Sequence, residues 1–302
     1  MSDLVVVGSL NMDMVLRTPR MPEVGETIQG EELRYFPGGK GANQASAAAK
    51  LGCSTAMVGK VGADEFGEKL VDNIREAGVV TEHVLIDNHS PTGTAVIIID
   101  QSGDNFIIVS EGANGNLARR DIEEVKSIIK KSNYVLLQFE IPLDTVEHVV
   151  EFASAHGVKI ILNPAPAKKI NDDIIKKVRY LIPNETELQL LTDLPVVDLD
   201  SAQVAATQMI QRGIQVVVVT MGAQGALIVR NDGSEYVPAF EVDVVDTTAA
   251  GDAFIGGFCF GLLHNMKLSD AVRYGCAAGA LATTKMGAQN SLPNNNAVDT
   301  II

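Results

Sequence analysis

Short apolar runs alternate along the chain with longer segments that repeat apolar residues at the period of a helix. The runs are rich in β-branched and aromatic residues, as expected of buried strands. They are Leu4–Val7, Tyr134–Leu137, Lys159–Leu162, Tyr180–Ile182 and Val216–Thr220. The helical segments between them include Asp121–Lys131, Leu143–His156 and Ala202–Arg212. This alternation predicts an α/β fold, a Rossmann-like sandwich in which helices cover both faces of a parallel sheet.

Two segments break the alternation. Residues 13–36 contain two extended stretches around Pro19, Pro22 and Gly25 and show no helical period. Residues 94–110 have the pattern of a hairpin, with apolar stretches on either side of a turn at Gln101–Asp104. Together they predict a small antiparallel sheet that projects from the main body as a lid. We therefore expect one α/β domain over residues 1–302, with a β lid inserted from about 13–36 and 94–110.

Composition and charge narrow the classes of function. Apolar residues make up 46% and charged residues 21% of the 302 residues, the profile of a soluble globular enzyme. The net charge of −14 argues against nucleic-acid binding, because phosphate backbones select basic surfaces.

Three features of the sequence bear on location. No apolar stretch approaches the roughly 20 residues needed to span a bilayer. The first residues lack the basic region and the long apolar run of a secretory signal. The cysteines Cys53, Cys259 and Cys276 are widely spaced and favour neither a disulfide framework nor a zinc site. We therefore expect a cytoplasmic protein without a membrane partner.

The segment Asp246–Asp252, with the sequence DTTAAGD, carries the strongest chemical signal. The apolar helical run after it places Ala249, Ala250 and Gly251 at a helix N-terminus, where unpaired N–H groups form an anion hole for phosphate. Asp252 lies in the first turn of that helix. A carboxylate there fits a general base that deprotonates an attacking hydroxyl. A helix cap is the alternative, since Asp is also common at helix starts.

Polar residues follow two of the predicted strands, where ligands of open α/β sheets bind. Asn11 and Asp13 follow the first strand, and their side chains suit vicinal diols, although turns also favour these residue types. Glu140 follows the strand Tyr134–Leu137 and is either a cap before Pro142 or a ligand for a hydroxyl.

The stretch Gly38–Ala45, GGKGANQA, is rich in glycine, which permits a close approach of the backbone to a ligand. We expect Asn43 to open a helix over residues 44–50. The stretch is neither a Walker A loop nor a dinucleotide fingerprint, and an ordinary glycine turn is the alternative to a ligand site.

Two further loops follow strands. Asn184 and Glu187 have the spacing of a capping box at a helix start. The loop Thr220–Gly225, TMGAQG, offers glycines for close backbone access to a ligand. It also suits a β-hairpin turn, because Ala226–Val229 has the pattern of the next strand.

The motifs DTTAAGDAF and GGKGANQA resemble the two signatures of the ribokinase-like carbohydrate kinases. They stand in the family's order, about 200 residues apart, and the likeness runs from residues 8–13 to residues 287–289. The resemblance implies the ribokinase-like fold and transfer of the γ-phosphoryl group of ATP to a sugar hydroxyl, with Asp252 as base and ribose as the leading substrate. Deoxyribose, fructose or a nucleoside is the alternative substrate. A sugar sensor without catalysis and a nucleotide-dependent dehydrogenase are the alternatives from other classes.

The resemblance also assigns residues to ligands. The sugar-facing set is Asn11, Asp13, Gly39, Lys40, Gly41, Asn43, Glu140 and Asp252. The ATP-facing set is Asn184, Thr220, Gly222, Gly225, Gly251 and Cys276. Glu187 is assigned to Mg²⁺ through water.

A monovalent cation, potassium, is expected beside the anion hole. The resemblance assigns it to the Asp246 carboxylate, the Ser291 hydroxyl and the main-chain oxygens of Thr248, Ala282, Lys285 and Gly287. An oxygen-rich cage with little charge suits such an ion better than a tightly held divalent ion. The alternative is that Asp246 only braces its loop.

The hairpin of the predicted lid indicates a homodimer, which the resemblance also implies. Both of its faces carry apolar residues, namely Val96, Ile97, Ile98, Ile99, Ile107 and Ile108. Burial of both faces needs a second layer, and the lid of another copy would supply it.

Overall fold

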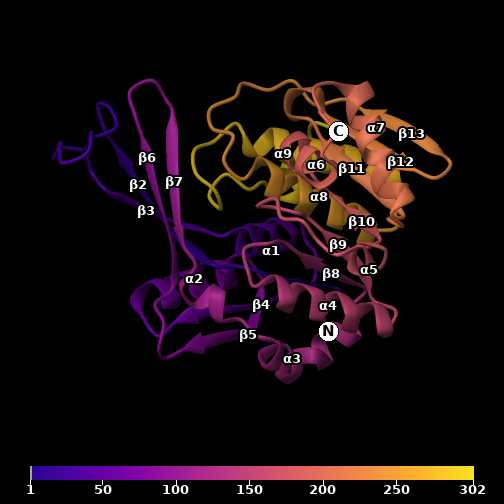
Figure 1. Cartoon of the computed structure of the whole chain (residues 1–302), viewed down its shortest axis with the longest axis horizontal. Helices are drawn as coiled ribbons and strands as arrows, with labels where there is room; N and C mark the ends of the chain where they lie inside the picture. The colour runs from indigo at the N-terminus through magenta and orange to yellow at the C-terminus, as the bar shows by residue number, and fades with distance from the viewer. Residues whose placement is uncertain (1) are drawn as a thin grey trace.

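The computed structural model describes residues 2–302 and places the main sheet between two layers of helices (Figure 1). Within those residues the sheet has nine strands, in the order β13-β12-β11-β10-β9-β8-β1-β4-β5. The strands are β1 (Leu4–Val7), β4 (Thr55–Gly62), β5 (Val80–Asp87), β8 (Tyr134–Leu137), β9 (Lys159–Leu162), β10 (Tyr180–Leu181), β11 (Val216–Thr220), β12 (Ala226–Arg230) and β13 (Gly233–Val237). Their pairings are parallel except for the antiparallel hairpins of β12 with β11 and β13, so the expected parallel sheet is confirmed.

Two sets of helices cover the two faces of this sheet. One face is covered by α3 (Arg119–Lys131), α4 (Leu143–Ala155), α5 (Asp172–Ile175), α6 (Glu185–Thr192) and α7 (Leu199–Gln211). The other is covered by α1 (Lys40–Lys50), α2 (Glu65–Glu76), α8 (Ala250–Leu263) and α9 (Leu268–Ala282), and the short α10 (Asn295–Asp299) packs on α9. Within residues 2–302, none of the helices is long and apolar enough to cross a membrane.

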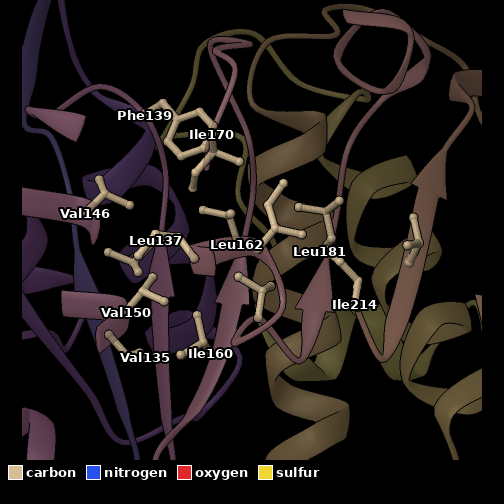
Figure 2. Close-up of a cluster of buried hydrophobic side chains, with 14 of the residues drawn as sticks. Val135, Leu137, Phe139, Val146, Val150, Ile160, Leu162, Ile170, Leu181 and Ile214 are labelled. Atoms are coloured by element: carbon tan, nitrogen blue, oxygen red, sulfur yellow. The ribbon is translucent and has the colours of Figure 1, made fainter. Parts of the chain in front are cut away.

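The pleat of the strands explains why both faces are buried. Val5 and Val7 of β1 belong to the core on the α4 side, whereas Leu4 and Val6 belong to the core on the α8 side. Successive side chains of a strand point to opposite faces, so a strand buried on both sides has a continuous apolar run. Figure 2 shows the first of these cores, in which side chains of β8 and β9 meet those of α4; the labelled residues of these elements are Val135, Leu137, Ile160, Leu162, Val146 and Val150.

A second, smaller sheet projects from the main body (Figure 1). Its strands are β2 (Asn11–Arg17), β3 (Arg34–Gly38), β6 (Gly93–Ile99) and β7 (Asn105–Ser110), in the order β3-β2-β6-β7. The predicted lid strands are therefore confirmed. The two outer pairings are antiparallel as expected, but β2 and β6 pair in parallel. Both strands leave the main body at the same end and run outward together.

Most of the expected boundaries are close to the observed ones. The strands β1, β8, β9 and β11 have the predicted limits, and α3, α4 and α7 begin or end within a few residues of theirs. The segment from β4 through α2 to β5 was not singled out by the apolar pattern. In β4 the run TAMVGKVG is interrupted by two glycines and by Lys60, which lies buried and 2.7 Å from Asp121.

Candidate active site

Buried polar side chains gather at the carboxyl ends of the central strands. Ser9 and Asn11 follow β1, Gln138 follows β8 and Asn163 follows β9, and each of them is at most 7% exposed. The chain leaves β1 for β4 on one side and later adds β8 on the other, so the order of strands reverses at β1. Crevices at such switch points are where open α/β sheets bind ligands.

Asp252 lies in the first turn of α8 and points to α1. Its Oδ2 accepts a hydrogen bond from Nδ2 of Asn43 at 2.9 Å, and its Oδ1 accepts one from Nε2 of Gln44 at 2.9 Å. Burial raises the pKa of the Asp252 carboxyl above its usual range, although the charge of Lys40 and the two amide donors act to lower it. The N-cap of α8 is Ala249, so Asp252 does not cap the helix.

The turn in front of α8 is strained and open. Ala249 has a φ of 59°, in the left-handed region, which costs a residue with a Cβ about 1–2 kcal/mol. Ala250 begins the helix, and a Cβ built on Gly251 would meet no atom within 4 Å. Free N–H groups with space before them at a helix N-terminus are what a phosphate group needs.

The start of α1 differs from the expectation. The prediction that Asn43 opens this helix is wrong, because α1 already begins at Lys40. Gly39 makes this possible, with a φ of 90° and a position where a Cβ would lie 2.7 Å from the backbone nitrogen of Asn11. Asn43 therefore sits inside the first turns of α1, where its side chain reaches Asp252.

Glu140 approaches the same helix start from the loop after β8. Its Oε2 accepts hydrogen bonds from the backbone nitrogen of Lys40 at 3.0 Å and from Oγ of Ser9 at 2.5 Å. A carboxylate at a helix N-terminus is favoured by the helix dipole. One oxygen of Glu140 thus fixes the glycine-rich turn, which leaves Oε1 as the oxygen for a ligand.

The ammonium group of Lys40 lies among carboxylates. Burial lowers its pKa, but the charges of the carboxylates outweigh this effect and raise it; they belong to Asp252, Glu140, Glu187 and Asp13. Asp13 on β2 has a pKa raised to about 7 by burial and by the negative charges of Glu140 and Asp252. The structure therefore brings the three carboxylates of the expected sugar-facing set, and that of Glu187, within electrostatic reach of the Lys40 ammonium.

Asn11 is held by a residue that the sequence pattern did not reveal. Nδ2 of Asn114 donates to Oδ1 of Asn11 at 2.8 Å and to the backbone oxygen of Leu10 at 2.9 Å, and Oδ1 of Asn114 accepts from the nitrogen of Leu10 at 3.0 Å. Asn114 belongs to the 3₁₀ turn η1 (Gly112–Asn116) and is buried. This contact occupies the oxygen of the Asn11 amide, so the Nδ2 of Asn11 is left as the donor to a ligand.

The expected ATP-facing loops lie next to each other beside α6. Asn184 is the N-cap of α6 and forms a capping box with Glu187, and its backbone pairs with Thr220 across an isolated bridge. Burial raises the pKa of the Glu187 carboxyl, which the backbone nitrogen of Asn184 and the charge of Lys40 partly offset. The capping box is therefore confirmed.

The remaining ATP-facing residues have different surroundings. Gly222 opens the short 3₁₀ turn η2 (Gly222–Gln224) in the hairpin between β11 and β12, as the hairpin alternative predicted. A Cβ at Gly222 would meet no atom within 4 Å, whereas one at Gly225 would lie 2.2 Å from the backbone oxygen of Val237. Gly225 is thus required by the packing of the protein itself. Cys276 on α9 is buried, and burial raises the pKa of its thiol to about 12.

The residues expected around a cation come from two loops that are joined by Asp246. Its Oδ2 accepts a hydrogen bond from the nitrogen of Gly287 at 2.8 Å, and its Oδ1 accepts from the nitrogen and Oγ1 of Thr248. Ser291 is buried and donates its Oγ hydrogen to the backbone oxygen of Ala288. These contacts agree with the bracing alternative, and they also bring the candidate oxygen ligands of both loops together.

Several site residues were missed by the motif analysis, although the sequence contained a signal for them. Ser9, Gln138 and Asn163 each stand within two residues of the carboxyl end of a predicted strand, in the place where Asn11 and Glu140 were sought. A polar residue there interrupts an otherwise apolar stretch. Gln44 lies in the glycine-rich stretch but was not among the expected site residues, and its side chain proves to contact Asp252.

Comparison with known proteins agrees with this geometry. Residues 1–295 match the family model described as pfkB family carbohydrate kinase. The chain therefore belongs to the pfkB family of carbohydrate kinases. Ribokinase of Haemophilus influenzae is 39% identical over 290 residues, which cover 96% of this chain and 95% of that protein. Deoxyribokinase of Salmonella typhimurium is 38% identical over 293 residues, which cover 97% and 96% of the two chains.

Among solved structures, Arabidopsis thaliana ribokinase complexed with ribose and ATP has a TM-score of 0.93 and 32% identity to this chain. The match covers 99% of this chain and 98% of that chain. The α/β fold with its small projecting sheet is thus that of the ribokinases.

Proposed function

We propose that this chain transfers the γ-phosphoryl group of ATP to D-ribose and forms ribose 5-phosphate. The observation that carries the proposal is the position of Asp252, a buried carboxylate at the start of α8 beside a helix N-terminus that is open to a phosphate group. Asp13 and Lys40, which we propose to face the sugar, interact electrostatically with Asp252, and Asn11 lies on the same strand as Asp13. Relatives named as ribokinases support the choice of ribose.

The proposed reaction follows from these positions. The carboxylate of Asp252 takes the proton from the sugar hydroxyl as its oxygen attacks the γ-phosphorus, and ADP leaves with the electrons of the broken P–O bond. The N–H of Gly251, in the open first turn of α8, faces the developing negative charge, while the N–H of Ala250 donates to the backbone oxygen of Thr247 at 3.2 Å and so holds the turn in shape. Asn11 supplies a donor and Asp13 an acceptor to neighbouring hydroxyls, which holds the sugar in place.

The protonation state of Asp252 sets the pH dependence. A base acts only when it is ionised, and burial raises the pKa of Asp252, so activity falls as the pH drops through that pKa. The ammonium of Lys40 limits this effect because its positive charge favours the carboxylate.

Magnesium belongs to the proposal as a substrate-bound ion. Within residues 2–302 there is no group of three or more His, Cys, Asp or Glu side chains that could hold a metal ion. We propose that the ion is carried by the phosphates of ATP and oriented through water by Glu187, whose half-buried carboxylate interacts electrostatically with Lys40. When bound, Mg²⁺ neutralises phosphate charge during transfer.

Location in a reducing cytoplasm is also part of the proposal. All of the cysteines, Cys53, Cys259 and Cys276, are unpaired and buried. Unpaired buried thiols are typical of proteins from reducing compartments.

A panel of sugars tests the proposed substrate. We expect ADP release with ribose to exceed that with fructose or a phosphosugar in kcat/KM by at least about tenfold, since an unpaired buried polar group costs about 1–3 kcal/mol. 2-Deoxyribose is the second candidate because a deoxyribokinase is as similar to the chain as the ribokinases are. A higher kcat/KM for deoxyribose would replace ribose by that sugar, and sugar binding without ADP release would indicate a sensor.

Potassium activation tests the proposed cation site. Because Asp246 joins two loops ahead of Ala249–Gly251, an ion between them would preorganise the anion hole without joining the chemistry. We expect the rate to fall when potassium is replaced by sodium or a bulky organic cation at constant ionic strength and constant Mg²⁺. Asp246→Ala should lose this response, and the exposed Asp243→Ala should keep it. An equal rate in all cations contradicts the site.

The outer surface of the lid tests the proposed dimer. The edge strand β7 exposes Phe106, Ile107, Ile108 and Val109, with Ile108 68% exposed. An apolar edge strand is a surface that pairs with another chain. We expect a dimer in light scattering at micromolar concentration and a monomer for Ile108→Asp. Val204→Asp, which changes a valine on α7 that is 62% exposed, should leave the mass unchanged. A wild-type monomer with full activity contradicts this interface.

A further inference from the structure

The side chain of Gln44 uses every polar atom of its amide inside the protein. Its Nε2 donates to Oδ1 of Asp252 at 2.9 Å and to Oδ1 of Asn163 at 3.1 Å. Its Oε1 accepts from Nε2 of Gln138 at 2.5 Å. Gln44 and Gln138 are both completely buried, so no water competes for these contacts. A line of amides therefore runs from the end of β8 through α1 to the carboxylate on α8.

The amide of Gln44 can take only one orientation here. If it were turned over, its oxygen would face the oxygens of Asp252 and Asn163, and its nitrogen would face the nitrogen of Gln138. The orientation of Asn163 is fixed in turn, because its Nδ2 donates to the backbone oxygen of Ile182 at 2.9 Å. The donor of Gln44 is thus aimed at Asp252 by contacts on both sides of its amide.

Gln138 is held in place at an energetic disadvantage. Its Oε1 has no hydrogen-bond partner within residues 2–302, although it is buried. A Cβ on Gly8 would lie 2.1 Å from that oxygen, so the glycine at the end of β1 leaves the space in which the side chain lies. An unpaired buried acceptor is unfavourable, and packing alone would favour an apolar residue at this position. The arrangement is explained if the Nε2 of Gln138 must point to Gln44.

We propose that Gln138 and Gln44 form a relay of positioning residues that orients the carboxylate of Asp252 and keeps it ionised, ready to accept the proton of the sugar hydroxyl. The proposal rests on the proposed function, in which Asp252 is the base. A donor to each carboxylate oxygen stops rotation of the group and leaves the remaining lone pairs for the sugar hydroxyl. The bond from Gln138 polarises the amide of Gln44, which makes Gln44 a stronger donor.

The relay adds to the charges that face Asp252. Lys40 favours the ionised carboxylate, whereas Glu140, Asp13 and Glu187 disfavour it, as does burial. Hydrogen bonds to the charged form lower the pKa of a carboxyl group without adding another charge to a crowded site. Loss of the Gln44 donor should therefore raise the pKa of Asp252 and misalign its oxygens.

The test compares Gln44→Met, Gln138→Met and the double variant in full-length protein. The matched control is Ser132→Ala, which removes a buried hydroxyl at the opposite end of β8. The first readout is kcat against pH with saturating ribose and ATP. The second is the titration of the Asp252 side-chain carboxyl carbon by ¹³C NMR, assigned by its loss in Asp252→Asn. The third is the Kd for ribose by calorimetry.

For Gln44→Met we expect kcat to fall about 10- to 100-fold, as is typical when a catalytic group is misplaced. The acidic limb of the profile of kcat against pH and the midpoint of the NMR titration should both move up by about one pH unit. Gln138→Met should change both in the same direction but less, and the double variant should match Gln44→Met because Gln138 acts only through Gln44. The Kd for ribose should stay within about threefold of wild type in each variant.

Three results would overturn the relay. They are an unchanged pH limb and NMR titration in Gln44→Met, effects in the double variant that add independently, and an equal shift in Ser132→Ala. If Gln44→Met does not fold, the test rests on Gln138→Met. A folded Gln138→Met protein in which Asp252 titrates as in the wild type would contradict the relay. Failure of the proposed function is distinct, because then the wild-type protein would release no ADP, while the NMR titration would still report on the relay.

Discussion

Asp252→Asn is expected to lower kcat by about 10²–10⁴-fold, the usual contribution of a general base. The amide keeps nearly the shape of the carboxylate but cannot accept the proton of the sugar hydroxyl. It also brings its own donor against Asn43 or Gln44, both of which donate to Asp252 in the wild type. We therefore expect the loss to appear in kcat, with the affinity for ribose changed by only a few-fold.

Two measurements separate a chemical effect of this change from a structural one. Single-turnover kinetics gives the rate of phosphoryl transfer, and a thermal melt reports whether the variant is folded. The melt should show no large loss of stability, because the neutral amide removes the penalty that burial places on the charged form of Asp252, and this gain offsets the contact between two donors. A folded variant that turns over at the wild-type rate would show that another group is the base.

Asp13→Asn is expected to weaken ribose binding and at the same time to stabilise the ligand-free protein at pH 8. The pKa of Asp13 is raised to about 7 in the folded protein from 3.8 for an isolated group. Between these two values the folded protein keeps a proton that the unfolded chain has lost, so the free energy of unfolding falls as the pH rises through this window. Above pH 7 the full penalty is present, and asparagine removes it.

The free energy of unfolding is expected to rise by about 1–3 kcal/mol at pH 8 and by almost nothing at pH 4. The change is followed as the difference in Tm between variant and wild type at each pH. The matched control is Asp64→Asn. Despite some burial, hydrogen bonds from Thr92 and Gly67 lower the pKa of Asp64, so this variant should lose stability at pH 8. Ribose affinity should fall about tenfold or more in Asp13→Asn alone. A gain that is the same at both pH values, or unchanged ribose affinity, contradicts the role given to Asp13.

The sequence was sufficient for those parts of the fold that follow from local patterns. The apolar runs of β1, β8, β9 and β11 are buried on both faces, so their limits are the limits of the runs themselves. Pairings between distant segments do not leave such a pattern. The parallel contact of β2 with β6 joins residues about 80 positions apart and has no turn that would indicate it.

The candidate site was predictable where small residues and acids stand in a motif. Asp252 and the turn before it are in this class. Gln44 and Asn114 were not, because a buried amide has no preferred neighbour in sequence and acquires its role only from partners on other elements. The start of α1 was misplaced for a related reason, since the carboxylate at its N-terminus, Glu140, comes from a loop 100 residues further along the chain.

The residues proposed to hold the sugar are also part of the projecting sheet. Asn11 and Asp13 are the first residues of β2, and the same strand continues outward to Arg17, where it pairs with Ile99 near the tip of the hairpin. Asp13 and Arg17 are about 13 Å apart along an extended strand. We therefore expect that any rotation of β2 that brings Asp13 to a sugar hydroxyl will produce a larger displacement at the tip of the hairpin. A water molecule offers Asp13 no fixed set of hydroxyls, and we expect this displacement to require a bound sugar, so that ATP is protected from hydrolysis until the sugar binds.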